Sequence, residues 1–150
     1  MKVVINAGYG GFGLSHDAVM EYAKRKGIVL FPHIDDISSK VYGTKATLSN
    51  PSTLIHYTTV PWDEFNVVSE KDEEKPIGPG RFEESGKLYF TDRDVKRTDP
   101  DLINIINEMG DSANGRCAKL KIVEIPDNIE YEIDEYDGFE HIAERHRIWE

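Results

Sequence analysis

The chain has 150 residues, with 39% hydrophobic and 10% aromatic residues and a formal net charge of −10. This composition excludes a disordered chain and fits one globular domain, so we expect a single domain over residues 1–150. The acidic excess repels phosphate backbones, which argues against general nucleic-acid binding. Cys117 is the single cysteine, and neither a signal peptide nor a membrane-spanning apolar segment is recognisable, so we expect a cytoplasmic protein without membrane contact.

The N-terminal residues predict a β-α-β unit. Apolar runs at residues 2–7 and 28–31 are typical of buried strands. Between them, Ser15 is a good N-cap for a helix that Gly27 would end. Such a unit favours a parallel pair of strands joined by a right-handed crossover.

The middle of the chain, residues 32–94, shows no helical period. Short β-like pieces stand at 53–60, 65–68 and 88–91. Segment 69–86 is rich in charge, proline and glycine, and we expect it to be a mobile loop.

The C-terminal third predicts a helix, two strands and a second helix. Thr98 is expected to cap a helix with Pro100 in its first turn, and strands are expected at 120–125 and 129–136. The last apolar residues fall on one helical stripe, namely Phe139, Ile142, Ala143, His146 and Trp149. The fold class is therefore α+β, with an N-terminal β-α-β unit followed by a mainly antiparallel sheet with helices on one face.

A glycine-rich loop, Gly8–Gly13, follows the first strand and matches G-x-G-x-x-G. Three interpretations stay open: a dinucleotide site, a loop that binds another phosphate or ring, and a tight crossing of backbones. Asp17 in the next helix would repel a pyrophosphate, and no second β-α-β unit follows, so the dinucleotide site is the weakest of the three. Tyr9 and Phe12 would stack on a planar ligand, or else cover the core or a subunit interface.

Arginines near expected element ends offer an anion site. Arg93 and Arg97 precede the helix at Thr98, and Arg116 precedes the strand at 120–125. Pairing with neighbouring aspartates, or a solvated loop, is the alternative for these side chains. The candidate ligand-binding residues are therefore Tyr9, Gly10, Gly11, Phe12, Gly13, Arg93, Arg97 and Arg116.

The sequence supplies no recognisable catalytic set. Ser15, His16 and Asp17 are consecutive and cannot form a relay, and Cys117 borders an expected buried strand, which indicates an inert thiol. The acidic row Glu130, Glu132 and Asp134 is typical of a solvated strand face, with a metal site or a partner surface as alternatives. We expect no catalytic residue, no metal and no cofactor.

Several stretches resemble a family of small phage and prophage proteins. They are Tyr9–Ser15 (YGGFGLS), Arg97–Leu102 (RTDPDL), Ala118–Asp127 (AKLKIVEIPD), Tyr131–Gly138 (YEIDEYDG) and His146–Trp149 (HRIW). The resemblance implies phage origin, and accessory phage proteins often act against host defence. It therefore implies a protein of the host cytoplasm, expected to form a homo-oligomer, that sequesters a small nucleotide-derived immune signal of the cyclic-oligonucleotide or ADP-ribose type without catalysis.

Two other functions fit the same sequence. One is a protein–protein inhibitor that acts through the acidic surface at Glu124–Glu140, which carries eight acidic residues and no basic one. The other is a small NAD-linked or nucleotide-processing enzyme that uses the Gly8–Gly13 loop.

Overall fold

The computed structural model describes residues 1–36, 41–45, 55–59, 61 and 89–146. The strand expected at 65–68 and the mobile loop expected at 69–86 lie outside the described residues. Both helices and antiparallel sheets are present, which confirms the α+β class. The one domain expected from chain length is divided into two compact units: unit 1 comprises Met1–Arg25 and Asp92–Glu150, and unit 2 comprises Lys26–Thr91.

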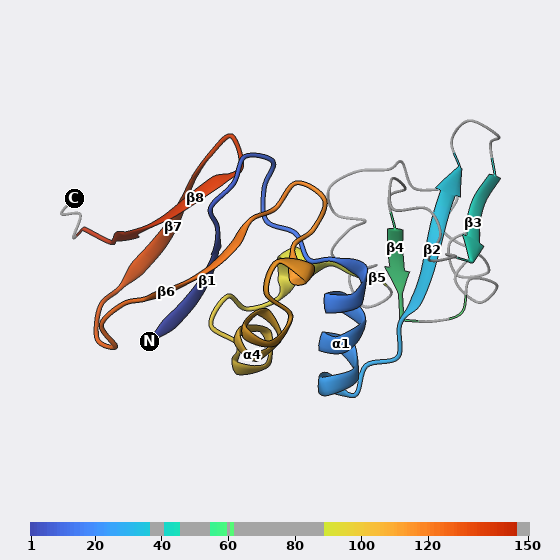
Figure 1. Cartoon of the computed structure of the whole chain (residues 1–150), viewed down its shortest axis with the longest axis horizontal. Helices are drawn as coiled ribbons and strands as arrows, with labels where there is room; N and C mark the ends of the chain where they lie inside the picture. The colour runs from blue at the N-terminus through green and yellow to red at the C-terminus, as the bar shows by residue number, and fades with distance from the viewer. Residues whose placement is uncertain (37–40, 46–54, 60, 62–88, 147–150) are drawn as a thin grey trace, which may run out of the picture. The chain divides into compact units, whose positions relative to one another are not determined.

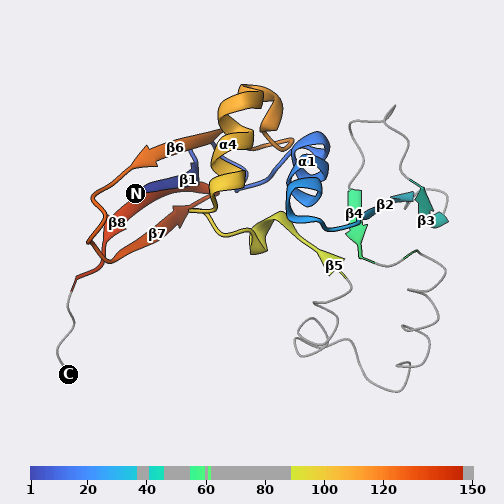
Figure 2. The same ribbon diagram turned by 90° about the horizontal axis from the view of Figure 1, so that it is seen from below.

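The strands of unit 1 are arranged around β1 (Lys2–Asn6). Strand β1 pairs antiparallel with β6 (Leu120–Glu124), with Val4 opposite Ile122. At its other edge, Val4 N donates to Arg97 O at 2.9 Å and Asn6 N donates to the side chain of Glu140 in β8. Strands β7 (Tyr131–Tyr136) and β8 (Phe139–Glu144) form a hairpin, and Figure 2 shows the strands in the order β6, β1, β8 and β7.

Two sequence predictions fail in these strands. The predicted parallel pair is wrong, because β1 pairs with β6 and the following strand β2 (Phe31–Asp36) belongs to the sheet of unit 2. The predicted C-terminal helix is also wrong, because residues from Phe139 onward pair with β7 across a two-residue turn. Backbone pairing with β7 there outweighs a helical stripe that was only weakly apolar.

The helices of unit 1 begin and end largely at the residues that local signals indicate. Helix α1 (His16–Lys26) is capped by Ser15, whose Oγ accepts from Ala18 N at 3.2 Å, and it ends before Gly27 at φ +68°. Helix α4 (Pro100–Met109) ends before Gly110. Its cap is Asp99 and not Thr98, because Asp99 Oδ1 accepts from Asp101 N at 2.9 Å.

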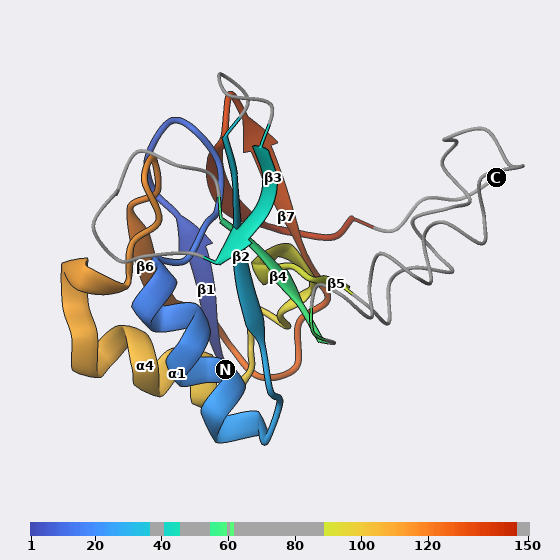
Figure 3. The same cartoon turned by 90° about the vertical axis from the view of Figure 1, so that its right-hand side faces the viewer.

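Helices α1 and α4 lie side by side, as Figure 3 shows. Tyr22 OH donates to Asp99 Oδ2 at 3.0 Å, and Arg25 of α1 pairs with Glu21 and with Glu108 of α4. The hydrogen bond from Arg25 lowers the pKa of the Glu21 carboxyl, and the bond to Glu108 raises the pKa of Arg25. The helices and β1 enclose a core of Val3, Val4, Phe12, Leu14, Ala18, Val19, Tyr22, Ala23, Leu102, Ile105 and Ile106.

Replacing Asp99 with alanine is expected to lower the free energy of unfolding by about 1–2 kcal/mol, because the helix loses its cap and Tyr22 loses its acceptor. Urea denaturation measures this change. Tyr22→Phe is the matched control, since it removes only the second contact, and its cost is expected to be smaller. Equal costs for the two variants would show that the cap contributes nothing.

Unit 2 contains a four-stranded antiparallel sheet in the order β3-β2-β4-β5, built from β2, β3 (Val41–Lys45), β4 (Ile55–Thr58) and β5 (Tyr89–Phe90). The second predicted strand therefore begins at Phe31 and not at Ile28. His33 lies opposite His56, and a buried hydrogen bond of 2.9 Å joins His33 Nε2 and Thr58 Oγ1. None of the helices in the described ranges is long and apolar enough to cross a bilayer.

Candidate binding site at the β7–β8 turn

Three segments meet at one end of unit 1: the glycine loop after β1, the segment before β6, and the β7–β8 turn (Figure 1). Ala7 N donates to Lys119 O at 2.7 Å, and Gly115 N donates to Gly13 O at 2.8 Å. On the other side, Gly10 N donates to Asp137 O at 3.3 Å. The glycine loop is therefore held along its length by two neighbouring segments.

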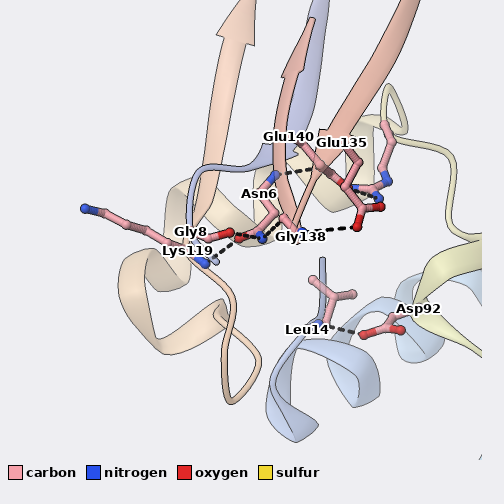
Figure 4. Close-up of polar contacts among 9 residues, drawn as sticks. Asn6, Gly8, Leu14, Asp92, Lys119, Glu135, Gly138 and Glu140 are labelled. Atoms are coloured by element: carbon pink, nitrogen blue, oxygen red, sulfur yellow. Dashed lines mark hydrogen bonds and ion pairs between the residues drawn. The ribbon is translucent and has the colours of Figure 1, made fainter. Parts of the chain in front are cut away.

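Asn6, the last residue of β1, connects these three segments. Its side chain is fully buried, and its Nδ2 donates to Gly8 O and Gly138 O, both at 2.6 Å. Its Oδ1 accepts from Lys119 N at 2.7 Å, so both donors and the acceptor of the amide are used (Figure 4). A fully bonded buried amide specifies one arrangement of the backbones around it.

A buried ion pair lies beside Asn6. Glu140 is 5% exposed and accepts from Asn6 N at 2.8 Å and from two nitrogens of Arg97, at 3.0 and 3.2 Å. The guanidinium of Arg97 lies 3.3 Å from the centre of the Phe12 ring, which is itself buried. Arg97 thus combines a two-pronged carboxylate contact with a cation–π contact, and it connects the glycine loop to β8.

The glycines of this region allow close backbone contact. A Cβ on Gly138 would lie 2.6 Å from Gly10 N and closer still to Gly11 N, and a Cβ on Gly10 would lie 2.5 Å from Cys117 Cβ. Gly10, Gly11 and Gly138 all have positive φ, at +115°, +88° and +80°. The structure thus agrees with the third sequence interpretation of the loop, a tight crossing of backbones.

Exposed aromatic rings cover the outside of the crossing. Tyr9 is 70%, Tyr136 80% and Phe139 39% exposed, and we call these three residues the aromatic patch. The rings of Tyr9 and Phe139 are 5.8 Å apart, and Tyr136 lies directly opposite Phe139 in the hairpin. Asp137 at φ +51° and Gly138 at φ +80° form the two-residue turn between Tyr136 and Phe139, and positive φ at both positions is typical of a type I′ turn.

Three carboxylate residues adjoin Tyr136 in the sequence of the hairpin. Asp134 lies on the same strand face as Tyr136, and Glu135 lies on the opposite face, which it shares with Glu140. Asp134, Glu135 and Asp137 are exposed, and we call them the acidic rim. Glu135 Oε1 accepts from Gly138 N at 3.2 Å, and Asp134 lies 3.5 Å from His141. Lys119 on the opposite side extends away from the turn (Figure 4). Asp134 and Asp137 therefore place exposed carboxylates within two residues of Tyr136 in the sequence.

The predicted ligand-binding residues divide into two groups. Phe12 and Arg97 come together inside unit 1, where Arg97 pairs with Glu140 and not with a neighbouring aspartate. Tyr9, Gly10, Gly11 and Gly13 form the loop, and Arg116 is exposed on the neighbouring segment. Arg93 is exposed on a 3₁₀ turn, Asp92–Asp94. Cys117 is exposed and not buried, and it stands three residues before β6.

Sequence reasoning missed Asn6, Tyr136, Phe139 and Glu140. The bonds from Asn6 to Glu140 and to Gly138 join residues more than 130 positions apart, and no local pattern reveals them. A local sequence signal does exist for the pair Tyr136 and Phe139. Asp137-Gly138 after an alternating strand is the sequence of a two-residue hairpin, and it places Tyr136 opposite Phe139.

No group of three or more His, Cys, Asp or Glu side chains suited to a metal ion is found among the described residues. No family model matches the chain, and neither a curated protein nor a solved structure shows significant similarity to it.

Proposed function

We propose that this chain is a non-catalytic binding protein that docks on a protein partner through the aromatic patch. The observation that carries the proposal is the exposure of three aromatic rings, Tyr9, Tyr136 and Phe139, at 70, 80 and 39%. Aromatic residues are enriched at protein interfaces, where large rigid side chains contribute most of the binding energy.

The shape of the patch supports a protein partner over a small molecule. Tyr136 and Phe139 flank the tip of a hairpin, so they project outward, whereas small ligands bind in concave sites that enclose most of their surface. Arg97 is paired with Glu140, and Phe12 is packed in the core. Two residues expected to hold a nucleotide therefore serve the fold.

A photo-crosslinking amino acid at position 136 tests the proposal in a lysate of the cells from which the gene derives. We expect one partner to be crosslinked from position 136, because that side chain would lie in the interface. The control places the same amino acid at Val29, which is 68% exposed and lies in unit 2. Identical adducts from both positions, or none from position 136, would contradict the proposal.

Sequestration of a nucleotide-derived signal is the second candidate. It is favoured by Tyr9, a 70% exposed ring on the glycine loop against which a base could stack, and by the exposed Arg116 next to Cys117. The resemblance to phage proteins also supports this candidate and an anti-defence role. Incubation with cyclic oligonucleotides or ADP-ribose compounds, followed by heat denaturation, would release unchanged ligand if the protein sequesters it. Release of a converted product would indicate an enzyme.

A further inference from the structure

We infer that the partner segment bound by the aromatic patch presents arginine side chains. This inference rests on the proposed function and adds the chemistry of the partner. Exposed rings attract a cation over their faces, and carboxylates beside them bind the same cation through charge-assisted hydrogen bonds. Two rings of the aromatic patch, Tyr136 and Phe139, and the three carboxylates of the acidic rim lie close together in the sequence of the hairpin, within Asp134–Phe139.

The interior of unit 1 contains an arginine that is bound by a ring and a carboxylate together. There, the guanidinium of Arg97 lies 3.3 Å from the centre of the Phe12 ring while two of its nitrogens contact Glu140. The ring of Phe12 contacts the face of the guanidinium, and the carboxylate of Glu140 bonds the N–H groups at its edge. At the surface, Tyr136 and Phe139 supply exposed rings, and Asp137, which stands between them in the sequence, supplies an exposed carboxylate.

Charge favours a basic occupant over an acidic or neutral one. The chain carries a net charge of −10, and the segment Glu124–Glu140 has eight acidic residues and no basic residue. Burial of the aromatic patch and the acidic rim against another acidic protein would place like charges together, which costs affinity. Arginine is favoured over lysine because its planar guanidinium both stacks on a ring and pairs with a carboxylate along two parallel bonds.

Short synthetic peptides test the inference on the full chain. The probes are glycine–serine peptides that carry either arginine, lysine, citrulline or glutamate at the same positions, with binding followed by calorimetry. We expect the arginine peptide to bind more tightly than the lysine peptide, and its affinity to fall as salt is raised from about 50 to about 500 mM. Citrulline keeps the shape of arginine but not its charge, so that peptide is expected not to bind.

Variants of the chain locate the binding. Tyr136→Ala and Asp137→Asn are each expected to weaken the arginine peptide by about three- to five-fold. Asn tolerates the positive φ of position 137, so D137N keeps the turn. The controls are Val29→Ala for a lost exposed apolar side chain and Glu124→Gln for a lost exposed charge, and neither is expected to change the affinity.

Three outcomes would overturn the inference: equal affinity for the arginine and citrulline peptides, equal weakening by D137N and E124Q, or no binding of the arginine peptide. Crosslinking from position 136 distinguishes this failure from that of the proposed function. A partner crosslinked there without peptide binding would leave the docking proposal standing and remove the arginine chemistry. A different result would assign the patch to an anionic ligand. In that case a cyclic dinucleotide would displace the peptide, and the D137N chain would bind the dinucleotide more tightly than the unaltered chain.

Discussion

Replacing Glu140 with glutamine is expected to lower the free energy of unfolding by about 3 kcal/mol, because Arg97 would keep its charge without a counter-charge. Only 18% of the Arg97 side chain is exposed, so water cannot fully replace the lost carboxylate. The amide nitrogen of glutamine would also face the N–H groups of the guanidinium, donor against donor. Urea denaturation followed by circular dichroism gives the change.

Glu144→Gln is the matched control for this prediction. It makes the same chemical change on the same strand at an exposed position, and its effect is expected to stay within about 0.5 kcal/mol. The double variant Arg97→Met with Glu140→Leu should recover part of the stability lost in E140Q, since no unpaired charge remains. A cost for E140Q no larger than that of E144Q would show that the ion pair does not hold β8 to the rest of unit 1.

Replacing Gly138 with alanine is expected to cost more than about 2 kcal/mol, well above the strain of a left-handed alanine alone. The added Cβ would lie 2.6 Å from Gly10 N, so the turn and the glycine loop would have to separate. That separation would also break the bonds from Gly10 N to Asp137 O and from Asn6 Nδ2 to Gly138 O.

Two other glycines isolate the contribution of packing. Gly11 at φ +88° and Gly27 at φ +68° have no atom within 4 Å of an added Cβ. Gly11→Ala and Gly27→Ala therefore carry the backbone strain alone, about 1–2 kcal/mol each. If thermal and urea unfolding give the same loss for all three variants, the close crossing of Gly138 and the glycine loop is not a determinant of stability.

The helix ends of unit 1 could be predicted because their signals are local. Ser15 and Gly27 bound α1 as expected, and Pro100 and Gly110 bound α4, since each signal acts on backbone groups within one turn. The cap of α4 was misplaced by one residue. Thr98 and Asp99 are both good capping types, and the extended backbone of Asp99 places its side chain over the helix start.

Strand partners could not be predicted in the same way. The apolar run in β1 correctly indicates a buried strand, but nothing within it specifies β6, which begins more than 110 residues later. The inference of a parallel pair assumed that consecutive strands share a sheet. Here the chain leaves unit 1 after Arg25 and returns at Asp92, so β2 pairs within a different unit.

The wrong prediction of a helix after Gly138 also prevents the prediction of the exposed pair Tyr136 and Phe139. Phe139, Ile142 and Ala143 fit a helical stripe, yet in β8 Phe139 and Ala143 lie on one face, while Glu140 and Ile142 lie on the other. The buried Glu140 interrupts the apolar pattern of its face, and this favoured the helical prediction. A helix over these residues would place Phe139 on the buried stripe and away from Tyr136, so the helical prediction does not reveal the exposed pair.

The affinity of the crosslinked partner for the Tyr136→Ala chain tests the central claim most directly. The account predicts that this variant binds at least about 10-fold more weakly than the unaltered chain, as expected for an aromatic residue at the centre of an interface. Its free energy of unfolding should change by less than about 0.5 kcal/mol, because the ring is 80% exposed. Unchanged affinity in a folded Tyr136→Ala chain would contradict the claim that the aromatic patch is the binding surface.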